Sequence, residues 1–305
     1  MDIALEKLKE RLSAPRLRMP GTLSTYLETG RRFLAWLGNG PPTESDFRKY
    51  FIYRRERGIS ERTLRKEFFH LKKLALANDW GWTFVPEDTP VSEEEPFAPP
   101  LMPETIEMLI KAQHLYLKAE RFYLAVSTTW GCRREELARI RKRDYDTESI
   151  LIRTAKHGPR VRHLIPDVLK PIFEAYHPKE HTPTALSIIF RRICNKAGVK
   201  VEKGTSFHGA RRSLRTLLEW HLADNRLPLS LVADYQGWSK TTKGIVYGGA
   251  SMLGIYAHPE VVSLDPFSTD RLIYPIHPFL PWWEEALQDE RAMISEKPSE
   301  SPTPS

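Results

Sequence analysis

The sequence is poor in cysteine, contains no long hydrophobic run and shows no internal repeat. Its only cysteines among 305 residues are Cys132 and Cys194, and neither belongs to a Cys-x-x-Cys pair. Two such cysteines cannot build a disulfide framework or the usual thiolate zinc site, so the sequence excludes these two features. No stretch of 18 apolar residues occurs, and the first residues do not resemble a signal segment. We therefore expect a cytoplasmic protein with no membrane partner.

What the sequence does contain is an uneven distribution of charge. The net charge is +7, but residues 1–85 carry +7 and residues 104–250 carry +11. The segment 86–103 between them carries −5, and residues 251–305 carry −6. Two basic blocks on either side of an acidic segment are typical of a protein that binds a polyanion. On charge alone, an ordinary solvated surface is the alternative.

The hydrophobic pattern divides the chain into four parts. Apolar residues spaced by three and four predict four short helices in residues 1–85, which would form a small bundle with a basic face. Residues 86–103 hold six prolines and five acids and are predicted to be a linker. Residues 104–270 form the second domain, and residues 271–305 form an extension with a helix at about 281–294 and a disordered tail. That helix packs either on its own domain or on a neighbouring subunit.

The second domain has a mixed pattern, so the predicted fold class is mainly α with a small β-sheet. Two β-rich runs surround a turn that contains Lys156. The predicted strands are 150–153 and 160–164, and the predicted helices are 104–114, 118–130, 133–142, 167–176, 184–197, 208–224 and 229–236.

Several short patterns in this domain carry side chains that could do chemistry. Gly131-Cys132-Arg133-Arg134-Glu135-Glu136-Leu137 places arginines and acids at a helix start, and His208-Gly209-Ala210-Arg211 places His and Arg one helical turn apart. Taken singly, each is ordinary: an Arg–Glu helix start is usually a surface ion pair. Their order along the chain is more specific, and it runs Arg133, Lys156, His208, Arg211, Trp238, Tyr247.

This order resembles the tyrosine recombinase (phage integrase) superfamily over residues about 20 to 255. The family's first catalytic arginine lies in a Gly-x-Arg-x-x-Glu-Leu stretch, its lysine lies in a hairpin turn, and its His-x-x-Arg box follows. The resemblance implies an N-terminal helical core-binding domain of the SAM-like type and a mixed α/β catalytic domain. It also implies site-specific recombination through a 3′-phosphotyrosyl intermediate, with no cofactor and no metal.

The resemblance also assigns roles to individual residues. Tyr247 would be the nucleophile, and Arg133 and Arg211 would hold the non-bridging phosphate oxygens. His208 would donate to the phosphate or accept the tyrosyl proton, and Lys156 would protonate the leaving 5′ oxygen. Trp238, where many members have His, would donate its indole N–H. Glu136 would orient the arginines, or else form a plain helix ion pair.

A second tyrosine competes for the role of nucleophile. Tyr256 stands in Ile255-Tyr256-Ala257-His258, which resembles the Tyr-x-His ending of many integrases. It follows Trp238 by 18 residues, whereas the family's tyrosine usually follows that position by about nine. We therefore expect Tyr247 to be the nucleophile and keep Tyr256 as the alternative.

Three functions remain open at this point. The leading one is a site-specific recombinase (an integrase, resolvase or transposon enzyme of a mobile element) that acts as a homotetramer on paired duplex DNA sites, with or without accessory proteins. A type IB topoisomerase would relax any supercoiled DNA by similar chemistry. A non-catalytic DNA-binding regulator with the same fold is the third, and the full set of candidate residues argues against it.

Overall fold

The chain folds into two compact units, Met1–Phe97 and Ala98–Ser305, each with its own hydrophobic core. The boundary between them falls inside the proline-rich acidic segment. The structure is a computed structural model, and each unit is described separately below. It describes residues 2–13, 20–38, 40–91, 99–155, 159–202, 204–238 and 267–295.

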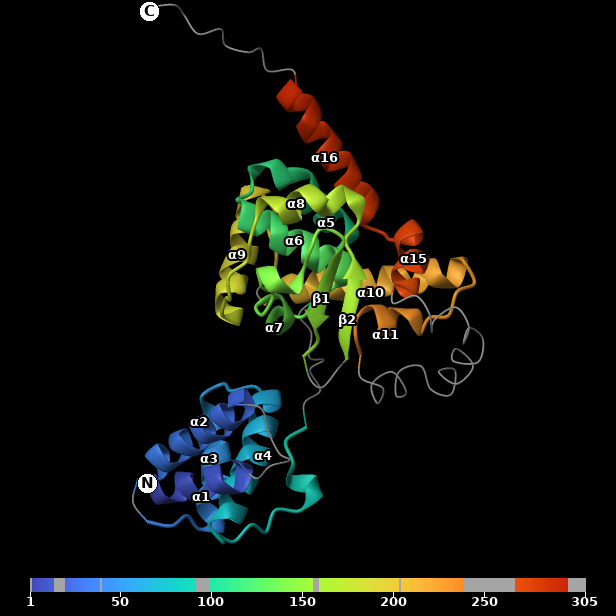
Figure 1. Cartoon of the computed structure of the whole chain (residues 1–305). Coiled ribbons are helices and arrows are strands. Elements are labelled where there is room, and N and C mark those ends of the chain that lie inside the picture. The colour runs from blue at the N-terminus through green and yellow to red at the C-terminus, as the bar shows by residue number, and fades with distance from the viewer. Residues whose placement is uncertain are drawn as a thin grey trace, which may run out of the picture. The chain divides into compact units, whose positions relative to one another are not determined.

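The N-terminal unit is a helical bundle with an aromatic core. Its described helices are α1 (Asp2–Ser13), α2 (Pro20–Leu37), α3 (Glu44–Glu56) and α4 (Glu61–Ala77), followed by the 3₁₀ turn η1 (Pro86–Asp88). Phe33 on α2 stacks on Phe47 of α3 with ring centroids 4.7 Å apart, and both rings are fully buried. These four helices form the blue body in Figure 1, as the periodicity of residues 1–85 predicted.

The C-terminal unit consists of helices around one two-stranded sheet (Figure 1). The fold is therefore mainly α with a small sheet, as predicted. Its described α-helices are α5 (Pro103–Lys111), α6 (Lys118–Trp130), α7 (Arg134–Leu137), α8 (Lys170–Ala175), α9 (Pro183–Lys196), α10 (Phe207–Asp224), α11 (Leu231–Tyr235), α15 (Ser268–Ile273) and α16 (Leu280–Ser295). The 3₁₀ turns among the described residues are η2 (Ala112–Leu115), η3 (Lys142–Asp144), η4 (Asp167–Leu169) and η5 (Tyr274–Ile276).

The sheet is an antiparallel hairpin of β1 (Ser149–Arg153) and β2 (Arg160–Leu164). Ser149 pairs with Leu164 at one end and Arg153 with Arg160 at the other. The inner positions of β1, Ile150 and Ile152, are buried in the core, which fits the alternation expected of a half-buried strand. The packing of these two side chains therefore fixes the hairpin to the core.

One sequence prediction about this unit was wrong. A single helix was expected over residues 133–142, but α7 ends at Leu137. The carbonyl of Ala138 accepts from the N–H of His181 instead of continuing the helix, and Asp144 caps the following 3₁₀ turn by accepting from the N–H of Arg141 at 2.9 Å. The apolar periodicity continued through this turn because Ile140 is buried as well.

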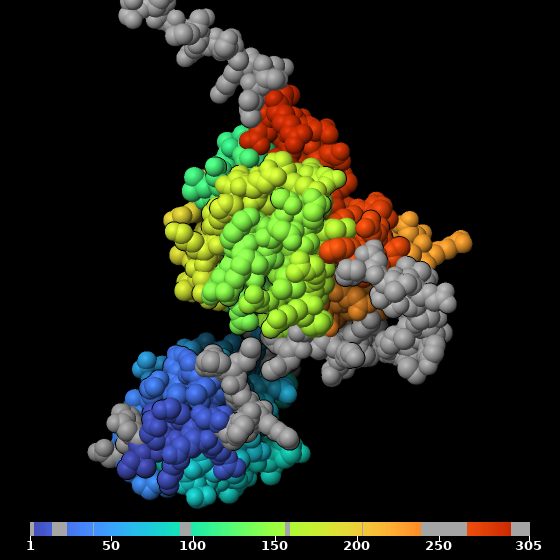
Figure 2. All heavy atoms as spheres, viewed as in Figure 1, coloured from blue at the N-terminus to red at the C-terminus, as the bar shows by residue number. Residues whose placement is uncertain are grey.

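Helix α16 packs on its own unit through its first turns. The buried Trp283 donates its indole N–H to Thr128 Oγ1 of α6 at 3.0 Å, and Ala286 and Leu287 are also buried. Figures 1 and 2 show this helix in red at the edge of the unit. In the described part of the chain, no helix has the length and apolar character needed to cross a membrane. The tail predicted after Ser295 lies outside the described residues.

Candidate active site

The segment that carries Arg133 begins where α6 ends. Gly131 closes α6 in the left-handed conformation, with φ 59° and ψ 41°. A side chain there would meet Gln236 Nε2 at 2.8 Å and Leu214 Cδ2 at 3.2 Å, so only glycine fits without displacing its neighbours. Arg133 follows in an extended conformation as the N-cap of α7. The chain therefore turns sharply at Gly131, and this turn positions Arg133.

Glu136 is the residue that joins the parts of the site. Its carboxylate is 2% exposed and accepts from the Arg133 backbone N–H and the Arg133 guanidinium, each at 2.7 Å. It also accepts from the backbone N–H of Ala155, two residues after the end of β1, at 2.8 Å. Arg211 Nη1 lies 3.9 Å from the same carboxylate. Because this one carboxylate contacts both arginines and the hairpin, it is more than a plain helix ion pair.

His208 and Arg211 both lie in the first turn of α10. Ser206 caps this helix, since its side-chain oxygen accepts from the N–H of His208 at 3.3 Å. Arg211 is 5% exposed, and its guanidinium donates to the carbonyls of Gly131 and Gln236. Burial, and then the charge of Arg133, lower the pKa of Arg211 to about 10. The guanidinium therefore keeps its charge at neutral pH even though it is buried.

The electrostatics of His208 follow from its cationic neighbours. Burial and the nearby arginines, Arg212 first and then Arg211 and Arg133, lower the pKa of His208 to about 4. The imidazole is therefore neutral at physiological pH and can accept a proton. A bound phosphate would add negative charge and raise this pKa again.

The Gln236-Gly237-Trp238 segment reaches the turn end of the hairpin. Gly237 has φ 61°, and a side chain on it would lie 2.2 Å from Thr154 Cγ2. The Trp238 indole N–H donates to Gln236 Oε1 at 3.3 Å, and the Arg215 guanidinium lies 4.8 Å from the Trp238 ring centroid. Trp238 is thus held next to α10, and its N–H would have to leave Gln236 to reach a phosphate.

Lys156, Tyr247 and the alternative Tyr256 lie outside the described residues. The described residues do fix where their segments start and end. Ala155, immediately before Lys156, is bound to Glu136, and Trp238 precedes the segment that contains both tyrosines.

The structure also identifies contributors that the sequence analysis left without a role. Gln236 contacts both Arg211 and Trp238. On β2, the buried His163 lies 2.8 Å from Asp270 of α15, and the other Asp270 oxygen accepts from the N–H of Leu164. The hairpin is thus attached to the chain that follows residue 266. No sequence signal indicated these contacts, because they join positions up to 107 residues apart.

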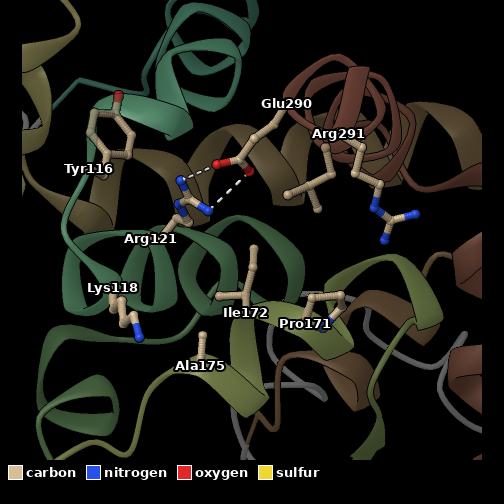
Figure 3. A pocket seen from close by; sticks show the side chains of 9 residues that line it. Tyr116, Lys118, Arg121, Pro171, Ile172, Ala175, Glu290 and Arg291 are labelled. Carbon is tan, nitrogen blue, oxygen red and sulfur yellow. Dashed lines mark hydrogen bonds and ion pairs between the residues drawn. The ribbon is translucent and has the colours of Figure 1, made fainter. Parts of the chain in front are cut away.

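A pocket of the C-terminal unit lies elsewhere, between α16, α6 and α8 (Figure 3). Arg121 of α6 binds Glu290 of α16 with two parallel contacts of 2.7 and 3.1 Å, drawn as dashed lines in Figure 3. Gln113 also donates to Glu290 at 3.0 Å. These polar contacts attach α16 to its unit. None of the candidate catalytic residues that the structure describes lines the pocket.

Arginines 133 and 211 form the chemically distinctive part of this unit. Both guanidiniums contact one buried carboxylate, so their positions are fixed before any ligand binds. Guanidinium is permanently charged and fork-shaped, which suits a phosphate whose negative charge grows during reaction. A neutral imidazole and an indole N–H lie on neighbouring segments. The arrangement can bind and polarise a phosphodiester.

Comparisons with known proteins agree on the fold. No family model matches the chain, and no curated protein matches it. Among solved structures, a lambda integrase dimer bound to a COC′ core site is 14% identical, with a TM-score of 0.61 over 80% of this chain and 94% of that chain. The Tn1549 transposon integrase in complex with transposon right end DNA is 16% identical, with a TM-score of 0.53 over 83% of this chain and 99% of that one.

A third solved structure is similar to this chain to about the same degree. XerH site-specific recombinase bound to a palindromic difH substrate is 15% identical, with a TM-score of 0.53 over 77% of each chain. These proteins are all tyrosine recombinases. The chain therefore has the fold of the tyrosine recombinase superfamily, as the order of its motifs predicted.

Proposed function

We propose that the protein is a site-specific recombinase that cuts and rejoins DNA through a 3′-phosphotyrosyl intermediate. The observation that carries this proposal is the pair Arg133 and Arg211 on the buried Glu136, within the tyrosine recombinase fold. A merely DNA-binding regulator would not need a buried guanidinium that is held by a shared carboxylate. The similar solved structures include DNA complexes of integrases and of XerH, which supports duplex DNA as the substrate.

In the proposed reaction, the phenolic oxygen of Tyr247 attacks the scissile phosphorus and loses its proton. The bond from phosphorus to the 5′ oxygen breaks, and Lys156 gives that oxygen a proton. Arg133 and Arg211 bind the two non-bridging oxygens, where charge grows at the pentacoordinate stage. Because the phosphodiester energy stays in the phosphotyrosine bond, a 5′ hydroxyl of another strand can reverse the step without a high-energy cofactor.

The remaining residues would transfer a proton, bind the phosphate and position the two arginines. His208 is neutral at physiological pH, so it can accept the tyrosyl proton and then bind the phosphate as a donor. Trp238 would supply one further N–H once it turns from Gln236 toward the phosphate. Glu136 would position both arginines and, through Ala155, the start of the Lys156 turn. It acts through these groups and does not touch the reacting atoms.

The proposal extends to the assembly and the domains. A lambda integrase tetramer bound to a Holliday junction is also similar to this chain, at 14% identity and a TM-score of 0.60. We propose a homotetramer on paired sites, with residues 1–85 as the core-binding domain, 86–103 as the linker and 104–270 as the catalytic domain. A role in a phage, transposon or other mobile element is part of this proposal.

The direct test is a nicked suicide substrate that carries the protein's recombination site. Wild-type protein should form a DNA adduct that survives a denaturing gel. Tyr247→Phe should bind the DNA with nearly unchanged affinity and form no adduct, whereas the matched control Tyr256→Phe should still form it. Binding without any adduct in the wild type would favour the regulator, and relaxation of plasmids without special sites would favour the topoisomerase.

The proton donor has its own test. Lys156→Ala should slow cleavage of a normal substrate, because the leaving 5′ oxygen then lacks its acid. A 5′-thio substrate, whose leaving group needs little protonation, should restore most of the rate. Equal slowing of both substrates would remove Lys156 from this role.

A further inference from the structure

A second feature of interest lies on the N-terminal unit, between α2 and α3. A cavity of about 400 Å³ opens there, which falls in the size range of sites for small molecules. Three arginines and three aromatic residues line it, and they are Arg32, Trp36, Tyr50, Tyr53, Arg54 and Arg57. The cavity therefore brings guanidinium groups and aromatic rings together.

The aromatic side of the cavity is partly open to solvent. Trp36 and Tyr53 are half-buried, with ring centroids 5.8 Å apart. Behind them, the buried Tyr50 contacts Trp36 edge to face at 5.3 Å. The buried ring holds the two half-open rings in place, so a planar ligand would meet a wall that is already formed.

The charge of the cavity is positive. Glu67 is the buried carboxylate that binds Arg32 and Arg54, at 2.7 Å in each case. Arg57 is exposed, forms no ion pair with any described residue, and lies over the Tyr53 ring at 4.8 Å. Arg32 also binds Glu28 at 2.9 Å, so two carboxylates face Arg32 and Arg54. Among the described residues, Arg57 has only the Tyr53 ring as its partner. An anionic group at the mouth would therefore be attracted to Arg57.

The third ring of the cavity wall belongs to Tyr50. The Tyr50 hydroxyl is buried and makes no hydrogen bond to any described group. Burial, and then the charge of Glu67, raise the pKa of Tyr50 to about 12, so the group stays protonated and remains a donor. Its oxygen has almost no exposed surface, so the Tyr50 ring, and not its hydroxyl, forms the back of the cavity.

We propose that this cavity binds an unstacked nucleotide, with its base against Trp36 and Tyr53 and its phosphate on Arg57. Base–aromatic stacking and guanidinium–phosphate contacts are the two interactions that such a lining provides. The nucleotide is either an unpaired residue of the DNA or a free mononucleotide, and the first source rests on the proposed function.

The first experiment uses the full chain and 2-aminopurine deoxyribonucleoside 5′-monophosphate, whose fluorescence is quenched by stacking. Wild-type protein should quench it saturably. Arg57→Ala should weaken binding by roughly tenfold, because one charge-assisted phosphate contact is lost. Arg55→Ala is the matched control, since Arg55 is an exposed arginine of the same helix that pairs with Glu61 and does not line the cavity. It should bind like the wild type.

The second experiment separates the two sources. DNA duplexes with one unpaired 2-aminopurine and with the same base fully paired are compared. Quenching of the unpaired base that Arg57→Ala reduces and Arg55→Ala keeps assigns the site to DNA. Quenching of the mononucleotide alone assigns it to a free nucleotide. The proposal is overturned if neither probe is quenched, or if the two arginine variants behave alike.

The outcome is independent of strand cleavage. Tyr247→Phe should quench both probes as the wild type does, because Tyr247 is not part of the N-terminal unit. If the wild type forms no covalent DNA adduct but quenches the probes in an Arg57-dependent manner, the recombinase proposal fails and the nucleotide site stands. If adducts form and no probe is quenched, only the nucleotide site fails.

Discussion

At the scale of single residues, the site depends on the charge of Glu136. Its buried carboxylate lies between two guanidiniums, one of them buried, and it also receives a backbone N–H from the hairpin. Removing it would leave Arg211 buried beside Arg133 without a counter-charge. Burying an unpaired charge is among the most costly changes that one substitution can make.

Glu136→Ala should therefore lower the free energy of unfolding of the C-terminal unit by about 3–5 kcal/mol. The neighbouring Glu135 pairs with Arg134 at 3.7 Å on the exposed surface, so Glu135→Ala should cost no more than about 0.5 kcal/mol. Urea unfolding measures both values, and faster hydrogen exchange of the Ala155 amide should accompany the first. Similar small losses in both variants would show that Glu136 does not hold the site together.

A second residue-scale prediction concerns Gly237, which has both a left-handed φ and close neighbours. Gly237→Ala should cost more than Gly38→Ala, because Gly38 has φ 84° and nothing within 4 Å of its missing side chain. The strain common to both is about 1–2 kcal/mol. Adding Thr154→Ser to Gly237→Ala removes the clashing methyl group and should recover part of the difference. Equal thermal stability of the two alanine variants would contradict this reasoning.

At the scale of elements, α16 is fixed by a neutral histidine at its start. His277 Nδ1 accepts from the N–H groups of Phe279 and Leu280 at 3.1 and 3.2 Å. Its Nε2 donates to the carbonyl of Thr129 at 2.9 Å, which attaches the start of α16 to the end of α6. Burial lowers the pKa of His277 to about 4. A proton on Nδ1 would also point at the two N–H donors.

The stability of α16 should consequently depend on pH. The folded pKa lies below the ordinary 6.5, so the contribution of His277 is complete above pH 6.5 and is lost as the pH falls toward 4. The loss amounts to about 3 kcal/mol, and His208 titrates in the same window. Chemical unfolding between pH 7.5 and 4.5 should show this slope, and His277→Gln should make it shallower while the contribution of His208 remains. An unchanged slope in that variant would refute the role of His277.

The bounds of the helices show which elements could be predicted from the sequence and which could not. The helices at 118–130 and 208–224 were predicted to within a residue, because long amphipathic runs with clear ends leave few alternatives. The helix at 133–142 was predicted too long, because a buried turn has the same apolar spacing as a helix. The order of motifs indicated Arg133 and Arg211, but their common partner Glu136 also binds a backbone N–H 19 residues away. A contact of that kind leaves no pattern in the sequence.

At the scale of the whole molecule, the net charge of each part of the chain bears on how strongly the protein binds DNA. The net positive charge of residues 1–85 and 104–250 lies on two units that are each proposed to contact DNA, and the acidic linker and C-terminal segment should stay away from it. Binding of site DNA should therefore weaken by roughly a thousandfold between about 50 and 200 mM salt, as counterion release requires for several phosphate contacts. Fluorescence anisotropy with labelled site DNA measures this, and a nearly flat salt dependence would contradict it.

The central claim is that Tyr247 becomes covalently bound to DNA. The most direct measurement traps the adduct on a suicide substrate, digests it with trypsin and locates the linked residue by tandem mass spectrometry. The peptide after Lys243 contains both Tyr247 and Tyr256, and its fragment ions distinguish them. We expect Tyr247 alone to be linked to the 3′ phosphate of the DNA. A modification on Tyr256, or on any residue other than a tyrosine, would contradict it.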